Sequence, residues 1–238
     1  ARADGDVHSN LTNLLNKLSS GDTTSTGEPW VVRCARFNIT GLHFSYHDDN
    51  RPMRPFGVDF DHVDVRHADI SGRRFVLARD TVTAWLGDLR LDERSGLRID
   101  HLSGETRVGP DGILIEQLKL RTPRTEVDGR LQFTTPDWSA YSHFSQNVYM
   151  RVDLAPSRVE FADIALFAPE LQGIELPIRL KGRVRGPLSD MKGRDLELYF
   201  GQRSHFKGHA ELTGLPDVAN TFMLLDVEEL ATHHTDLE

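Results

Sequence analysis

The chain has almost no cysteine and no long run of apolar residues. Cys34 is the only cysteine among 238 residues, which excludes an internal disulfide and a zinc site built on cysteines. No apolar stretch approaches the roughly 18 residues that a membrane-spanning helix needs. The first ten residues are polar and acidic and lack the apolar centre of a signal peptide. An internal piece of a longer exported chain would show neither element, so these absences leave the compartment open.

An excess of positive charge and the familiar catalytic motifs are also absent. The chain has 28 basic and 36 acidic residues and a net charge of -8, which opposes binding to nucleic acid or to anionic membranes through bulk charge. It contains no Walker loop and no GxGxxG, HExxH, GxSxG or CxxC motif. We therefore expect a protein that is not an enzyme, with no catalytic residues, no cofactor and no nucleic-acid partner.

Three aspartates, Asp59, Asp61 and Asp64, are the strongest candidates for a metal or acid–base site. Such a group can form a calcium cluster or a carboxylate pair for glycoside chemistry. Because the EF-hand spacing is missing, we interpret them as an acidic, exposed strand edge that discourages edge-to-edge pairing. His43 and His47 lie on the polar side of a predicted strand, whereas a closed zinc site needs four converging ligands. We therefore expect no metal site.

Only two stretches have the periodicity of a helix. Apolar residues at i, i+3, i+4 and i+7 between Leu11 and Leu18 predict a short helix in a first segment, residues 1–27, which ends in a polar linker. Ser157 and Glu160 form a possible capping box at the start of a second helix, near 158–168, which Pro169 ends. This second helix either caps the sheet described next or packs on it as an ordinary core element.

Most of the remaining chain alternates apolar and polar residues with a period of two, which is typical of strands with one dry and one wet face. Turn signals such as 109–112 (Gly-Pro-Asp-Gly) separate the strands at short intervals and predict an antiparallel meander. A break at 134–147 divides the predicted sheet into segments 28–134 and 135–238, which we expect to be continuous. The alternating apolar positions include Leu42, Phe44, Tyr46, Val58, Phe60, Val63, Val65, Ile113, Ile115, Leu118, Leu120, Val148, Met150, Val152, Leu154, Ile174, Leu176, Ile178, Leu180, Leu196, Leu198, Phe200, Phe222 and Leu224.

The dry face of so many strands must be covered, and the periodicity leaves two alternatives open. Two sheets can pack as a closed β-sandwich, which would suit an adhesin-like or carbohydrate-binding module. Alternatively, one sheet can curl into an elongated groove that holds an apolar ligand. A six-residue strand is about 20 Å long, which is comparable with an extended acyl chain. The dry face is mostly Leu, Ile, Val and Phe, which suits a greasy ligand better than a sugar or nucleotide.

Two stretches of the sequence resemble a known protein family. The first comprises residues 95–103 (SGLRIDHLS) and 112–123 (GILIEQLKLRTP). The second runs from 159–171 (VEFADIALFAPEL) through 180–186 (LKGRVRG) to 214–218 (GLPDV) and Thr221-Phe222. Both stretches resemble the AsmA-like family of large periplasmic proteins, and within it most closely the TamB (translocation and assembly module subunit) family. The likeness covers most of residues 30–230, and its motifs are degenerate β-repeat patterns.

This resemblance favours the groove and implies a function. Such proteins are anchored in the inner membrane, extend through the periplasm and are implicated in phospholipid transport and outer-membrane protein assembly. The present chain lacks the anchor, so we expect an internal periplasmic segment. Its partners would be phospholipid acyl chains, other segments of the same long protein and an outer-membrane assembly protein. The residues predicted to line the groove are Val58, Phe60, Val63, Val65, Ile113, Ile115, Leu118, Leu120, Val152, Leu154, Leu196 and Leu198.

Overall fold

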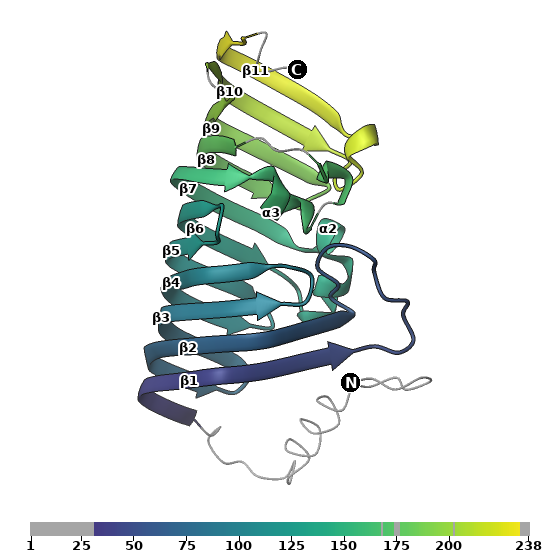
Figure 1. The fold of residues 1–238 in the computed structure, drawn as a ribbon. Coiled ribbons are helices and arrows are strands. Elements are labelled where there is room, and N and C mark those ends of the chain that lie inside the picture. Colours follow the sequence, from purple (N-terminus) through teal and green to yellow (C-terminus); the bar gives the residue numbers. More distant parts are fainter. Residues whose placement is uncertain (1–30, 168, 174–176, 202, 234–238) are drawn as a thin grey trace.

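The computed structural model describes residues 31–167, 169–173, 177–201 and 203–233. These residues form one antiparallel sheet of eleven strands, in which each strand pairs with its neighbours in sequence (Figure 1). The predicted fold class, a mainly β antiparallel meander with short helices, is confirmed. The strands are β1 (Val31–His47), β2 (His62–Ala78), β3 (Thr81–Glu93), β4 (Arg98–Gly109), β5 (Gly112–Arg121), β6 (Glu126–Thr134), β7 (Tyr149–Glu160), β8 (Pro177–Gly186), β9 (Asp190–Phe200), β10 (Ser204–Thr213) and β11 (Phe222–Ala231).

The helices are short and lie in the connections between strands. Between β6 and β7 a 3-10 turn, η1 (Trp138–His143), leads into α2 (Phe144–Asn147), and α3 (Phe161–Ala165) and η2 (Pro169–Leu171) follow β7. A last turn, η3 (Val218–Asn220), precedes β11. No helix in this described part of the chain is long and apolar enough to cross a membrane. The helix expected in 1–27 lies outside the described residues, as do Ile174 and Leu176.

Two local predictions from the sequence are wrong. The second helix begins at Phe161 rather than near 158, because Ser157 to Glu160 continue β7. The Ser157 hydroxyl donates to the carbonyl of Ala155 at 2.8 Å instead of capping a helix. Val58 and Phe60 do not form a strand, since they lie in the connection between β1 and β2. Across the break at 134–147, β6 pairs directly with β7, so the sheet is continuous there.

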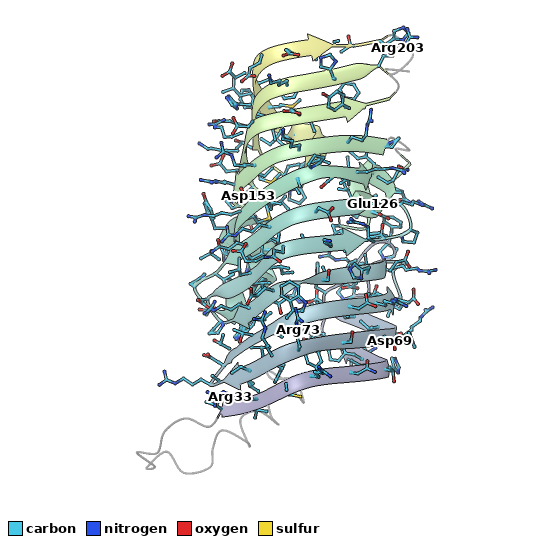
Figure 2. The ribbon with its side chains drawn as sticks, turned by 90° about the vertical axis from the view of Figure 1, so that its left-hand side faces the viewer. Arg33, Asp69, Arg73, Glu126, Asp153 and Arg203 are labelled. Atoms are coloured by element: carbon cyan, nitrogen blue, oxygen red, sulfur yellow. The ribbon has the colours of Figure 1, made fainter. Side chains whose placement is uncertain are left out.

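The two faces of the sheet differ sharply in polarity. Residues paired across neighbouring strands share a face, and apolar rows such as Ile115, Leu131, Val152 and Val184 therefore cross several strands on one side. The other side carries the charged residues, including Glu126, Asp153 and Arg73, which Figure 2 shows on the outside of the molecule. The strands bend so that the charged face is convex and the apolar face is concave (Figures 1 and 2).

A row of alternating large and small residues crosses the concave face where the sheet bends, and we call it the crease row. In every ladder from β2 to β11 the register shifts next to this row. Odd-numbered strands contribute a large apolar side chain and even-numbered strands a glycine. The crease row consists of Phe37, Gly72, Leu86, Gly104, Leu118, Gly129, Leu154, Gly182, Leu196, Gly208 and Val227.

Glycine is required in the crease row because neighbouring backbones approach closely there. A Cβ atom added to Gly104 would lie 2.7 Å from the carbonyl oxygen of Glu116, and one added to Gly182 would lie 2.8 Å from that of Asp195. Bulges increase local twist and bend the strand that contains them. Repeating the same bulge-and-glycine arrangement on successive strands therefore bends the whole sheet along one line and produces the concave face.

Candidate functional site

The concave face carries the apolar rows that cross the strands of the sheet. Ten of the twelve predicted lining residues lie on it, namely all except Val58 and Phe60. The cross-strand register connects them, because Leu120 pairs with Leu102 and Val127, and Leu198 pairs with Leu180 and Phe206. The ten residues are Val63, Val65, Ile113, Ile115, Leu118, Leu120, Val152, Leu154, Leu196 and Leu198.

The apolar face is neither closed nor freely exposed. Leu118 and Leu196, at the crease, are buried, with 5% and 7% of their surface exposed. Most of the other lining residues, such as Val152 and Leu198, are half-buried. Toward the edge strands the exposure rises, to 45% at Ile39 and 58% at Leu230. Since the described residues form a single sheet, no second sheet covers this face, and the closed two-sheet sandwich is not formed.

Three connecting segments lie at the open side of the bend, opposite the crease (Figure 1). They are the loop 48–61 between β1 and β2, the η1–α2 segment and α3. The loop reaches from the first strands to α3, where the Val58 amide donates to the Leu166 carbonyl at 2.7 Å. The hydroxyl of Thr122, after β5, donates to Asp163 of α3 at 2.5 Å. Loop 48–61 therefore connects strands that are distant in the sheet order.

The η1–α2 segment is attached to the opposite ends of the strands. The Phe144 ring meets the Phe133 ring of β6 edge-on at 5.4 Å between centroids. The amide of Ser189, in the β8–β9 turn, donates to the Ser145 carbonyl at 2.9 Å. Both rims of the bent sheet thus carry short helical segments. They narrow the open side of the concave face without forming a second layer of sheet.

Loop 48–61 is organised around the carboxylate of Asp59, of which only 1% is exposed. It accepts hydrogen bonds from the amides of Arg54 at 2.8 Å and Asp61 at 3.1 Å, and lies 3.0 Å from Nδ1 of His62. Burial opposes ionisation of Asp59, but these hydrogen bonds outweigh it and hold its pKa below the ordinary value of 3.8. The prediction of an exposed acidic strand edge is therefore wrong for Asp59, which is a buried organiser of a loop.

The other two aspartates of that group do not join Asp59 in a common site. Asp64 lies on β2, with a carboxylate oxygen 2.9 Å from Nε2 of His43. That contact lowers the pKa of Asp64. Across the described ranges, no group of three or more His, Cys, Asp or Glu side chains is arranged to hold a metal ion.

The convex face is covered by ion pairs between neighbouring strands. Arg130 lies 2.6 Å from Glu116, and Arg194 lies 2.6 Å from Glu211. The guanidinium of Arg121 holds the pKa of Asp128 below its usual value. Exposed pairs of this kind contribute roughly 0 to 1 kcal/mol each, so their main effect is to keep this face polar and hydrated.

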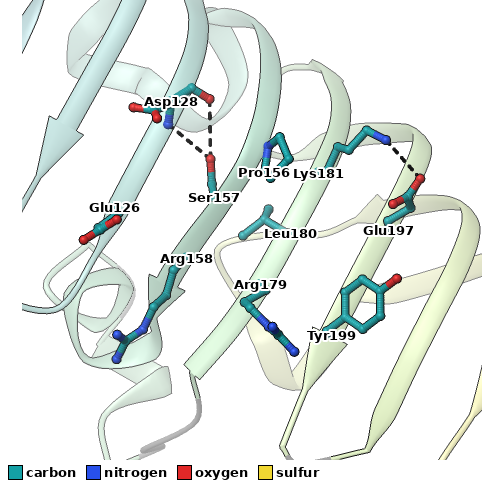
Figure 3. Close-up of a pocket in the computed structure, with 10 residues that line it drawn as sticks. All are labelled: Glu126, Asp128, Pro156, Ser157, Arg158, Arg179, Leu180, Lys181, Glu197 and Tyr199. Atoms are coloured by element: carbon teal, nitrogen blue, oxygen red, sulfur yellow. Dashed lines mark hydrogen bonds and ion pairs between the residues drawn. The ribbon is translucent and has the colours of Figure 1, made fainter.

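A recess of about 370 Å³ opens beside the bulge of β7 on the charged side (Figure 3). Its charged groups are largely matched, because Lys181 lies 3.1 Å from Glu197 and the Arg158 guanidinium 2.9 Å from Glu160. Arg179 lies over the ring of Tyr199, 5.5 Å from its centroid. Since its cations are mostly neutralised internally, this recess is a weaker candidate site than the concave face.

Comparison with models of known protein families, with curated proteins and with solved structures finds no match for this chain.

Proposed function

We propose that the chain is a groove segment of a periplasmic protein of the AsmA-like type, which holds phospholipid acyl chains on its concave face. The observation that carries this proposal is the apolar face of an eleven-stranded sheet that no second sheet covers in the described part of the chain. Contact between water and an apolar surface of this size is unfavourable. Each methylene group of a ligand that is buried against the surface contributes about 0.8 kcal/mol to the free energy of binding. An apolar ligand therefore suits this face.

The dimensions of the face support the same class of ligand. With neighbouring strands about 4.8 Å apart, eleven strands extend for roughly 50 Å along the groove. That length accommodates acyl chains of about 20 Å, either across the strands or along the groove. The apolar rows through Val152 and Leu198 contain no charged side chain. Few polar groups are thus available to select one ligand by hydrogen bonding.

The sequence resemblance to the AsmA-like family supplies the biological setting of the proposal. The segment would lie in the periplasm, within a long protein anchored in the inner membrane. Other segments of that protein would extend the groove, and an outer-membrane assembly protein would be its partner. The groove would conduct phospholipid or assist outer-membrane biogenesis by replacing water with apolar surface. No catalytic group is needed for that role.

The strand alternation provides an experiment with matched positions. A photoreactive residue, p-benzoylphenylalanine, is introduced in place of Val152 on the concave face, or of its neighbour Asp153 on the convex face. The purified full chain is incubated with phosphatidylethanolamine–phosphatidylglycerol vesicles and then separated from them. After irradiation, mass spectrometry measures the covalent lipid adducts of the protein. We expect lipid adducts at position 152 at least tenfold more abundant than at 153. Leu198 and Glu197 form a second such pair.

Equal adducts on the two faces, or none at positions 152 and 198, would contradict the proposal. Photocrosslinking is preferable to placing a charge in the groove at Leu118, because that side chain is buried at the crease. A buried, unpaired carboxylate there would unfold the sheet. Loss of lipid binding would then say nothing about the groove.

A further inference from the structure

The convex face carries a second recess, over β1, β2 and β3, and its arginines Arg36 and Arg73 have no acidic partner among the described residues. Its volume is about 590 Å³. The register places Arg36 opposite Arg73, and Arg73 opposite Trp85, in one cross-strand row. Figure 2 shows Arg73 on this outer surface. The residues lining the recess are Arg36, Phe37, Asn38, Ser71, Gly72, Arg73, Trp85 and Gly87.

The opposed arginines of the recess repel each other, and an anion bound between them would relieve that repulsion. Side chains directly opposite in an antiparallel pair have Cβ atoms roughly 5 Å apart, and like charges there repel. Within the described residues, no carboxylate lies within ion-pairing distance of Arg36 or Arg73. Arg183 and Arg194 also face each other, but they have acidic partners in Asp195 and Glu211. The pair in the recess has no such compensation. Within the described residues Arg151 and Arg185 also face each other without an acidic partner, but they line neither this recess nor the one beside the β7 bulge.

The indole of Trp85 orients two arginine side chains of β2 by cation–π contacts. The guanidinium of Arg73 lies 5.1 Å from the centre of the Trp85 ring, and that of Arg74 lies 5.8 Å from it. Such cation–π contacts orient a guanidinium and restrict its rotamers before any ligand arrives. Arg74 is also 3.6 Å from Glu105. The charge of Arg74 is therefore partly neutralised by Glu105, whereas Arg36 and Arg73 can each interact with a bound anion.

The rest of the lining adds donors and space but no negative charge. Asn38 and Ser71 are opposite each other in the register, next to the arginine pair, and provide an amide and a hydroxyl. Gly72 and Gly87 line the recess without side chains. Guanidinium forks match the oxygen geometry of a phosphate group, and an indole provides a flat face for the group attached to it.

We propose that the recess over β1–β3 binds a phosphate ester, with Arg36 and Arg73 on the phosphate oxygens and Trp85 against the attached group. Two sources have this chemistry: the headgroup of a phospholipid in a membrane, and a soluble phosphorylated compound. The site lies on the face opposite the apolar groove, so this inference does not depend on the proposed function.

The test compares two double variants of equal charge. Arg36→Gln/Arg73→Gln removes the cations of the recess. Arg151→Gln/Arg185→Gln removes another pair of opposed arginines, on β7 and β8, that lines neither this recess nor the one beside the β7 bulge. Binding of glycerol 3-phosphate is measured by calorimetry, and binding of phosphatidylglycerol vesicles by sedimentation against phosphatidylcholine vesicles. Circular dichroism confirms that each variant is folded.

We expect the first variant to bind at least tenfold more weakly than the wild type and the second to change less than twofold. Binding of the soluble phosphate supports a site for a free phosphorylated ligand, and binding of the phosphatidylglycerol vesicles alone supports a headgroup site. Equal losses in both variants would show attraction to general positive charge and overturn the proposal. The absence of wild-type binding to either probe would also overturn it.

Discussion

Replacement of Gly129 by alanine is expected to destabilise the sheet by about 4 kcal/mol, combining overpacking with a left-handed backbone. Gly129 sits in the crease row between Leu118 and Leu154, with φ at +152°. A Cβ atom there would come closer than 3.0 Å to the backbone carbonyl oxygen of Asp153. Backbone cannot move aside as the end of a side chain can, so β6 and β7 must separate. Urea unfolding followed by circular dichroism measures the loss.

Gly87 is the matched control for this substitution. It also lies within a strand of the sheet, but its φ is not in the left-handed range, and an added Cβ would meet its nearest atom, the Ser71 carbonyl oxygen, at 3.5 Å. Gly87→Ala should change the free energy of unfolding by less than about 0.5 kcal/mol. If both variants lose similar stability, glycine in the crease row is not what permits the bend.

The crease row also explains how much of the fold the sequence could predict. Period-two alternation identifies most strands because each has one dry face. The bend could not be predicted in this way, since it depends on glycines aligned across strands that are far apart in sequence. Ile115 and Leu118 illustrate the difficulty, because their spacing of three breaks the alternation. Gln117, with φ at +53°, forms the bulge that returns Leu118 to the concave face.

At both ends of the sheet, short stretches of alternating apolar residues predict the wrong structure or the wrong face. Val58 and Phe60 alternate with aspartates, yet they belong to a loop, and the nearby Pro55 and Gly57 were the better signals. In β11, Phe222 and Leu224 pair with Thr213 and Glu211 on the convex side.

Met223 and Leu225 pair instead with Leu212 and Ala210, on the concave side. A run of four apolar residues at the start of β11 contains no information about which two face the groove. Only the pairing with β10 decides it.

The predicted groove residues and the phosphate recess differ in how visible they are from sequence. Ten of the predicted residues lie together on the concave face because a strand places neighbours at i and i+2 on the same face. Arg36, Arg73 and Trp85 come from three strands, and only the register brings them together. Likewise, nothing in the local sequence indicates that Asp59 is buried, because its partners Arg54 and His62 look like ordinary exposed residues.

Replacement of Asp59 by alanine is expected to cost about 3 kcal/mol, because buried donors lose their charged acceptor. The amides of Arg54 and Asp61 would be left without this partner. Loop 48–61 would then release the contact between Val58 and Leu166 and uncover part of the groove. Hydrogen exchange should accelerate in 48–61 and around α3. Asp49→Ala, in the same loop but exposed, should leave both exchange and stability unchanged.

The contribution of Asp59 should also depend on pH in a defined direction. Its pKa in the folded protein lies below the ordinary value of 3.8, so the unfolded chain binds the proton more readily. The stabilisation is therefore fully present above about pH 4 and is lost as the pH falls through the lower folded value. The difference in unfolding free energy between wild type and Asp59→Ala should shrink over that acidic range. A difference that stays constant from neutral pH down to pH 2 would show that the ionised carboxylate does not hold the loop over the groove.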